Sequence, residues 1–253
     1  MFTPLIPGAV IHADRDSPPT TAPFAPLLGN LLFVANGSRP DITQSVSFLA
    51  RFSTHPTDMH WKALINIVRY LKSTINFKIF FPKQHSHEMK VVGYCDADFA
   101  GDLDDRKSTT GFIFFCNGTP ITWKSKKQTI MAGSSAEAEY IALNNAANEA
   151  MYFKNLLGDL HLAQEPITIF EDNQSALAMA STNDLTRTRH IGVKFHSVRF
   201  LVAANQLHLQ YIPTAMQRAD ILTKQLPKPT YSSLVSRIGL HNTFQSPEFD
   251  EVK

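Results

Sequence analysis

The sequence predicts an α/β protein: a mixed five-stranded sheet with helices on both faces, preceded by a small helical segment. Two patterns support this. Short runs rich in β-branched and aromatic residues alternate with longer segments whose apolar residues recur at helical spacing, in the order β-β-β-α-β-α-α-β-α. The chain has 253 residues, 43% of them hydrophobic and 18% charged, which is enough to bury a core and argues against general disorder.

The first third of the chain differs from the rest in composition and in the spacing of its apolar residues. Residues 1–28 hold six of the 15 prolines, which predicts an irregular arm. From Trp61 to Leu71 the apolar residues are spaced as on a helix, and residues 83–90 are polar. We therefore expect three domains. An arm with a small helical unit fills residues 1–84, an α/β domain fills 85–230, and a C-terminal tail fills 231–253.

The predicted strands are short and bounded by turn residues. They cover residues 91–96, 111–116, 119–124, 167–170 and 207–212. Asn117-Gly118 separates the second run from the third, and this pair favours a two-residue hairpin because both turn positions need positive φ. The second and third strands should therefore be antiparallel.

The predicted helices of this region follow the third strand. They cover residues 134–160, a short stretch from about 173, residues 191–204 and residues 214–224. Thr214 and Gln217 have the spacing of a capping box, which predicts the start of the last helix.

Three aspartates occupy positions where such folds place functional groups. Asp96 ends the first predicted strand, Asp172 follows the fourth, and Asp220 lies in the first turns of the last helix. Each one alone also fits a helix cap or a solvated turn. Together, at neighbouring strand ends, they predict a cluster.

The long helix adds one further acid to this set. Its apolar stripe includes Leu143, Ala146 and Ala150, and one step of four back from Leu143 is Glu139. A buried carboxylate is costly unless it is paired or bound to a metal, so Glu139 should have a function. We expect Glu137 to be an ordinary exposed acid of the first turn.

Three aspartates and a glutamate on one rim would repel one another without a cation. Hard oxygen ligands select Mg²⁺ or Mn²⁺, and two such ions about 4 Å apart support phosphodiester hydrolysis. The pattern thus favours a metal-dependent nuclease. The alternative is that these acids are scattered surface charges that never meet.

A series of motifs in this region closely resembles the ribonuclease H domain of copia-type LTR retrotransposon Pol polyproteins. The motifs are Tyr94–Asp102, Asp105–Phe112, Ser125–Gln128, Ser134–Leu143, Glu171–Ala176, Thr188–Ile191 and Arg218–Lys224. Upstream segments resemble the C-terminal end of the reverse transcriptase of the same elements: Pro26–Gly29, Ser38–Ile42, His60–Leu64 and Arg69–Lys72. A series in the same order is far more specific than one motif.

The resemblance implies a fold, an activity and a site. It implies a ribonuclease H-like fold, hydrolysis of the RNA strand of RNA–DNA hybrids, and two Mg²⁺ or Mn²⁺ ions. The acids that match the family's metal ligands and catalytic residues are Asp96, Glu139, Asp172 and Asp220. It also implies the polymerase part of a Pol polyprotein as a partner. The Tyr-Val-Asp-Asp-type polymerase turn is absent, so we expect no polymerase activity.

One departure from the family pattern concerns proton transfer. Many ribonucleases H carry a histidine in the loop before the last acid, whereas residues 212–218 contain none. Water or another residue would have to move the proton, which predicts slow turnover.

Several residues near the acids are candidate nucleic-acid contacts. They are Lys124, Lys126, Lys127, Ser134, Ser135, Asn173, Gln174, Arg187 and Arg189. Cations suit phosphates, and hydroxyl and amide groups suit the 2′-hydroxyls of an RNA strand. For the basic residues, solvated surface positions are an equally good interpretation.

The remaining sequence features restrict the class of protein. A net charge of +2 excludes a histone-like binder, and the two cysteines exclude a disulfide scaffold. Residues 25–35 are too short to cross a bilayer and the N-terminus predicts no signal peptide, so we expect an intracellular protein in the cytoplasm, a virus-like particle or the nucleus. A catalytically silent remnant that binds nucleic acid or protein is the alternative to an active nuclease.

Overall fold

The computed structural model describes residues 3–82, 89–162, 165–182 and 197–242. Contacts divide the chain into two compact units. One consists of Met1–Pro82 and Gln225–Lys253, and the other of Lys83–Lys224. The division into three domains remains a prediction.

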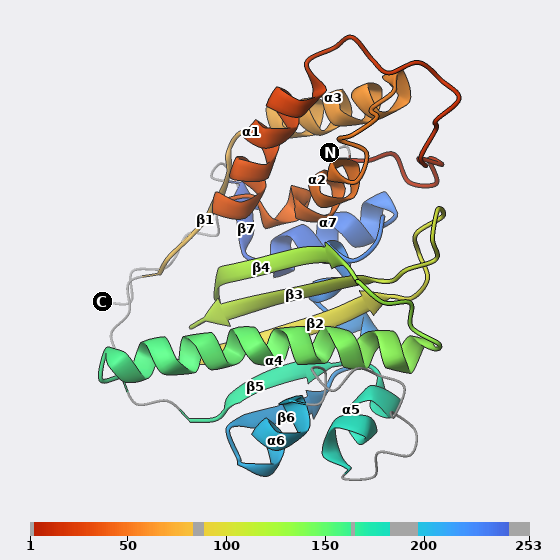
Figure 1. The fold of residues 1–253 in the computed structure, drawn as a ribbon. Helices are drawn as coiled ribbons and strands as arrows, with labels where there is room; N and C mark the ends of the chain where they lie inside the picture. The colour runs from red at the N-terminus through yellow and green to blue at the C-terminus, as the bar shows by residue number, and fades with distance from the viewer. Residues whose placement is uncertain (1–2, 83–88, 163–164, 183–196, 243–253) are drawn as a thin grey trace. The chain divides into compact units, whose positions relative to one another are not determined.

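The first unit is mainly helical (Figure 1). Its elements are α1 (Phe24–Gly37), η1 (Pro40–Ile42), α2 (Thr43–Ala50), α3 (Asp58–Ser73), α7 (Lys228–Arg237) and an antiparallel pair of strands, β1 (Phe77–Ile79) and β7 (Leu240–Asn242). A capping box formed by Thr57 and His60 starts α3. The expected helical segment is therefore present.

Residues 231–242, which the sequence analysis assigned to a tail, lie in α7 and β7 instead. Tyr231, Leu234 and Val235 are buried at a spacing of three and four residues. The residues that follow have a composition typical of a loose end, which hides this short helical pattern in the sequence.

A buried polar network ties α7 to the N-terminal part of the unit. The Arg39 guanidinium meets the Asp41 carboxylate at 2.7 Å, and the Tyr70 hydroxyl donates to the same carboxylate at 2.6 Å. Arg39 also donates to Thr74, and the Tyr231 hydroxyl donates to the backbone carbonyl of Asp41 at 2.9 Å. A buried ion pair satisfied in this way holds segments together that are distant in sequence.

The second unit contains a five-stranded mixed sheet, which confirms the predicted fold class. Its strands are β2 (Val91–Asp98), β3 (Thr109–Cys116), β4 (Thr119–Lys127), β5 (Ile167–Glu171) and β6 (Leu207–Tyr211). The order is β4-β3-β2-β5-β6; β2, β3 and β4 pair antiparallel, whereas β5 pairs parallel with β2 and β6. Asn117 and Gly118 both have positive φ in the β3–β4 turn, as predicted.

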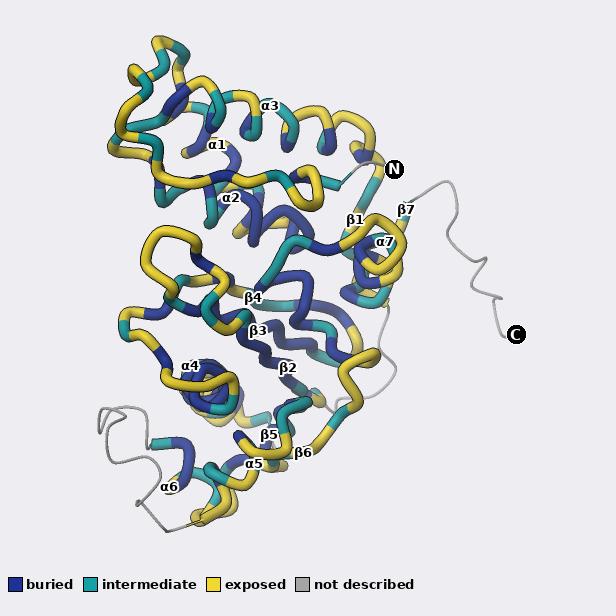
Figure 2. The backbone as a smooth tube through the Cα atoms, turned by 90° about the vertical axis from the view of Figure 1, so that its right-hand side faces the viewer, coloured by how far each residue is buried: buried dark blue, intermediate teal, exposed yellow. Residues whose placement is uncertain are grey.

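Helices α4 (Ser135–Asp159), α5 (Gln174–Ser181) and α6 (Ser197–Ala203) contact one another and the sheet. The long helix α4 runs along the sheet (Figure 1), and the central strands β2 and β3 are mostly buried (Figure 2). The rest of the helix predicted over residues 191–204 lies outside the described residues.

The prediction of a last helix over residues 214–224 is wrong. Two short 3₁₀ helices replace it, η3 (Thr214–Met216) and η4 (Ala219–Leu222). Gln217 between them has an extended backbone, and its side-chain amide donates to the Cys95 carbonyl of β2 at 2.8 Å. The chain is therefore held against the sheet and does not continue as an α-helix.

Gly111 of β3 permits this close approach, because a Cβ there would lie 2.7 Å from the Thr223 methyl group and 2.9 Å from Leu222. Gly111 alternates with Phe112, which lies in the core on the α4 side. The short helix η4 thus covers the opposite face of the sheet, where an α-helix was expected. None of the helices in the described ranges has the length and apolar character needed to cross a membrane.

Candidate metal centre

Three of the four predicted acids meet at one end of the sheet. Asp96 lies near the end of β2, Glu139 in the second turn of α4, and Asp172 directly after β5. One carboxylate oxygen from each lies within 4.8 Å of the others. Parallel pairing of β2 with β5 brings two of these residues to the same edge, and the helix stripe brings the third.

Burial and mutual repulsion make these carboxylates hard to ionise. Burial, with the charges of Asp220 and Asp172, raises the pKa of Asp96 to about 7, although Lys224 opposes the shift. Burial, followed by the charges of Glu171, Asp96 and Asp172, raises the pKa of Glu139 to about 11. A cation in the cluster would offset the repulsion between the carboxylates and compensate for their lost hydration.

The residues present fit a divalent cation. All the donors are carboxylate oxygens, which Mg²⁺ and Mn²⁺ prefer. Oε2 of Glu139 is buried and has no hydrogen-bond partner among the described residues. Because an unsatisfied buried oxygen is costly, a cation at this position would compensate for the burial.

The fourth predicted acid, Asp220, is linked to the cluster by Lys224, which lies between Asp220 and Asp96. Its Oδ1 lies 2.9 Å from Nζ of Lys224, which lies 4.0 Å from Oδ2 of Asp96. The Thr223 hydroxyl donates to the same Asp96 oxygen. The segment from 219 to 224 therefore supplies an acid, a cation and a hydroxyl to one side of Asp96.

Glu137 is not the exposed acid that the sequence analysis expected. It is buried, and its Oε2 accepts from the Gly133 amide at 2.8 Å, while its own amide donates to Ser134 Oγ at 3.2 Å. The loop before α4 folds back on the first helical turn and covers it. Glu137 therefore holds the loop before α4 through its carboxylate. Of these two glutamates, Glu139 is the one whose carboxylate lies in the cluster.

Glu171, the last residue of β5, is not among the predicted site residues, yet it is fully buried beside the cluster. Its Oε1 accepts from the Asn173 amide at 3.0 Å and its Oε2 from Cys95 Sγ at 3.2 Å. Burial raises its pKa well above the ordinary value. The alternation of inward residues Ile167 and Ile169 along β5 could have identified this third inward position.

The predicted nucleic-acid contacts have different environments. Lys124 and Lys126 are exposed on β4. Lys127 contacts Asp102 and Asp105, each at 2.7 Å. Although burial opposes the shift, the hydrogen bond from Lys127 lowers the pKa of Asp102 to about 2. The charge of Lys127 is therefore already neutralised.

The predicted polar contacts lie at helix starts. Ser134 is the N-cap of α4, and Asn173 is the N-cap of α5, where its Oδ1 accepts from the Ala176 amide at 3.0 Å. Ser135 and Gln174 are exposed beside them. Arg187 and Arg189 lie outside the described residues.

Fold and site together define a ribonuclease H-like domain with a cluster of acids at one end of its sheet. The chain is 35% identical over 221 residues to a Nicotiana tabacum protein, "Retrovirus-related Pol polyprotein from transposon TNT 1-94", covering 87% of this chain and 16% of the relative. The Arabidopsis thaliana Pol polyprotein from transposon RE1 is 34% identical over 94% of this chain and 16% of its own length. These relatives are copia-type retrotransposon Pol polyproteins, to which the chain is homologous over most of its length, and it spans 16% of the length of each.

"Secreted RxLR effector protein 161" of Plasmopara viticola is 40% identical over 130 residues, which is 51% of this chain and 90% of that protein. The crystal structure of LC11-RNase H1 with an RNA/DNA hybrid covers 53% of this chain and 94% of its own, with 18% identity and a TM-score of 0.39. The foamy viral protease-reverse transcriptase with dsDNA covers 84% and 40%, with 16% identity and a TM-score of 0.42. No family model matches the chain.

Proposed function

We propose that this chain hydrolyses the RNA strand of RNA–DNA hybrids with two divalent cations, Mg²⁺ or Mn²⁺. The observation that carries the proposal is the cluster of Asp96, Glu139 and Asp172, in which one buried carboxylate oxygen has no partner among the described residues. The similarity to Pol polyproteins over most of the chain supports the choice of substrate.

The residues have separate roles in this proposal. Asp96, Glu139 and Asp172 would hold the ions, and Asp220 would complete the set from η4. Bound ions of this class activate water and stabilise the charge that develops on phosphate oxygens. Thr223 orients the Asp96 carboxylate through its hydrogen bond, and Glu171 fixes the Asp172 loop through the Asn173 amide.

One observation favours a second candidate function, which is binding without cleavage. The Lys224 ammonium group contacts Asp220 and lies 4.0 Å from Asp96, so it neutralises part of the charge that would attract a cation. A domain held in this state would bind nucleic acid or protein and leave it intact. In either case, the polymerase part of a longer Pol polyprotein would be a partner of the chain.

The test uses the full chain and an end-labelled RNA–DNA hybrid, with Mg²⁺, with Mn²⁺ and with chelator. Single-stranded RNA, duplex DNA and the Asp172→Asn variant are the controls. The proposal predicts cutting of RNA in the hybrid alone, lost with chelator and in the variant. A folded chain that binds the hybrid and does not cut it would replace this proposal with the second candidate.

A further inference from the structure

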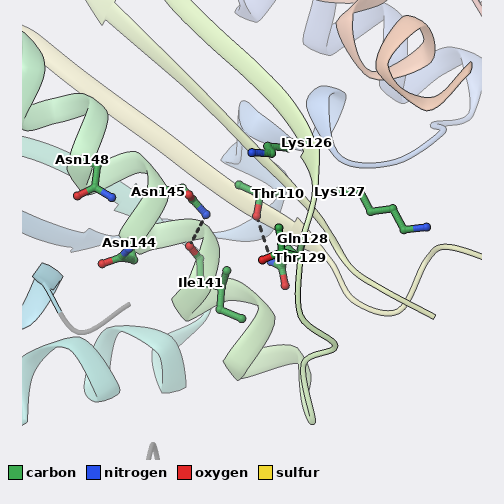
Figure 3. Close-up of a pocket in the computed structure, with 9 residues that line it drawn as sticks. All are labelled: Thr110, Lys126, Lys127, Gln128, Thr129, Ile141, Asn144, Asn145 and Asn148. Carbon is green, nitrogen blue, oxygen red and sulfur yellow. Dashed lines mark hydrogen bonds between the residues drawn. The ribbon is translucent and has the colours of Figure 1, made fainter. Parts of the chain in front are cut away.

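A polar groove runs between the edge strand β4 and helix α4, separate from the acid cluster (Figure 3). It consists of two adjoining cavities with volumes of about 230 and 220 Å³. The residues that line both are Thr110, Lys126, Asn145 and Asn148.

The cations of this groove are available for a ligand. Lys124 lines the second cavity and Lys126 both, and neither forms an ion pair within the described part of the chain. Lys127 points away from Lys126 in Figure 3 and pairs with Asp102 and Asp105. Lys124 and Lys126 lie two residues apart on one face of β4, so their Cα atoms are about 6.7 Å apart.

The opposite wall supplies amide groups, and the inner end is rigid. Asn145 and Asn148 lie three residues apart on α4, and Asn148 is exposed with no hydrogen bond to another described residue. Gln128 Nε2 donates to Thr110 Oγ1 at 3.0 Å and to the Ala138 carbonyl at 2.9 Å, which fixes β4 against α4. Side-chain amides and lysines together are typical of contacts to phosphate and sugar oxygens.

The register of the sheet relates this groove to the metal centre. Lys126 pairs with Thr110, and Thr110 pairs with Ala97, the residue after Asp96. Two strand spacings, about 10 Å, therefore separate Lys126 from the level of the acid cluster.

From this placement we infer that the β4–α4 groove holds backbone phosphates of the nucleic-acid substrate. Lys124 and Lys126 bind the phosphates, and Asn148 donates to their oxygens. Asn145 lines the same wall, where its Nδ2 donates to the Ile141 carbonyl at 2.9 Å. The inference rests on the proposed function for the identity of the substrate, but the contact itself needs no cleavage. Glu149 lines the second cavity and is the acidic residue of the groove; it accepts a hydrogen bond from Thr122 at 3.1 Å.

The test measures the affinity of the full chain for an RNA–DNA hybrid across a salt series, in the Asp172→Asn background so that substrate is not consumed. Replacing both lysines, Lys124→Gln with Lys126→Gln, should reduce the slope of log affinity against log salt by roughly 1.5–2. The Asn148→Asp variant should weaken binding at low salt by placing a carboxylate in the groove.

The matched control removes two lysines from elsewhere in the same unit. Lys90 precedes β2 at the end opposite Asp96, and Lys154 lies late in α4. The Lys90→Gln, Lys154→Gln variant has the same net charge as the groove variant, and its salt slope should stay within experimental error of the parent. Thermal unfolding of each variant verifies that it folds.

The outcomes separate this inference from the proposed function. Equal slopes in the groove and control variants overturn the groove, whether or not the wild-type chain cuts the hybrid. A reduced slope confined to the groove variant supports the groove even when the wild-type chain does not cut. Titration with inorganic phosphate identifies a site for the free anion: saturation by phosphate together with an unchanged hybrid slope also overturns the inference.

Discussion

The acid cluster should make the metal-free protein less stable as the pH rises from 5 to 8. An aspartate of pKa about 3.9 in the unfolded chain releases its proton well below pH 5, whereas the pKa of Asp96 in the folded chain is about 7. The folded state therefore holds a proton that the unfolded state has lost. Unfolding releases that proton, so a rise in pH favours unfolding until the pH passes 7.

The magnitude follows from the width of this window. Each pH unit between 5 and 7 costs about 1.4 kcal/mol for a group protonated only in the folded state, so Asp96 alone removes on the order of 3 kcal/mol of unfolding free energy. The raised pKa of Glu139, due to burial and neighbouring acids, acts in the same direction. The melting temperature should fall by roughly 5–11 °C over this range.

The assay is thermal unfolding in chelator at pH 5, 6, 7 and 8, followed by circular dichroism. The Asp96→Asn variant should show a shallower fall, and the exposed Asp159→Asn variant should follow the wild type. Mg²⁺ should raise the melting temperature more at pH 8 than at pH 5, because it binds the ionised cluster. A melting temperature that is flat or rises between pH 5 and 8 would refute the buried cluster.

Two further predictions concern packing and the buried ion pair. Gly111→Ala should lose about 1–3 kcal/mol of unfolding free energy, because its Cβ meets Thr223 and Leu222. Gly29→Ala, inside α1 with open space around it, should instead gain about 0.4–1 kcal/mol. Equal chemical-denaturation midpoints for the two variants would contradict this prediction. Asp41→Ala should lose about 3–5 kcal/mol because it leaves Arg39 buried without its carboxylate, while Asp16→Ala at an exposed position should change little. Urea unfolding curves check this, and a loss below 1 kcal/mol in Asp41→Ala would count against the network.

Local sequence patterns predicted much of the second unit. Asn117-Gly118 predicted the β3–β4 hairpin because the turn chemistry is local. The apolar stripe of the long helix predicted that Glu139, rather than Glu137, would join the cluster. Strand-end positions indicated Asp96 and Asp172, since the direction of a strand fixes which end of the sheet its last residue occupies.

The features that the sequence could not predict depend on contacts between distant segments. Gln217 has the spacing of a capping box, yet its side-chain amide donates a hydrogen bond to the Cys95 carbonyl of β2, and the predicted helix does not form. The position of α7 depends on Tyr231 meeting the carbonyl of Asp41, 190 residues earlier. Glu171 and Cys95 likewise meet only through the register of β5 with β2. The local periodicity of apolar residues does not indicate which distant segments come into contact.

The most direct test of the central claim compares two glutamates of one helix in the hybrid cleavage assay with Mg²⁺. Glu137 and Glu139 are both buried in the first turns of α4, but Glu139 alone contributes to the cluster. The account predicts that Glu139→Gln loses cleavage at least 100-fold while still binding the hybrid, and that Glu137→Gln retains it within about tenfold. Equal activity in the two variants, or loss in Glu137→Gln alone, would contradict the account.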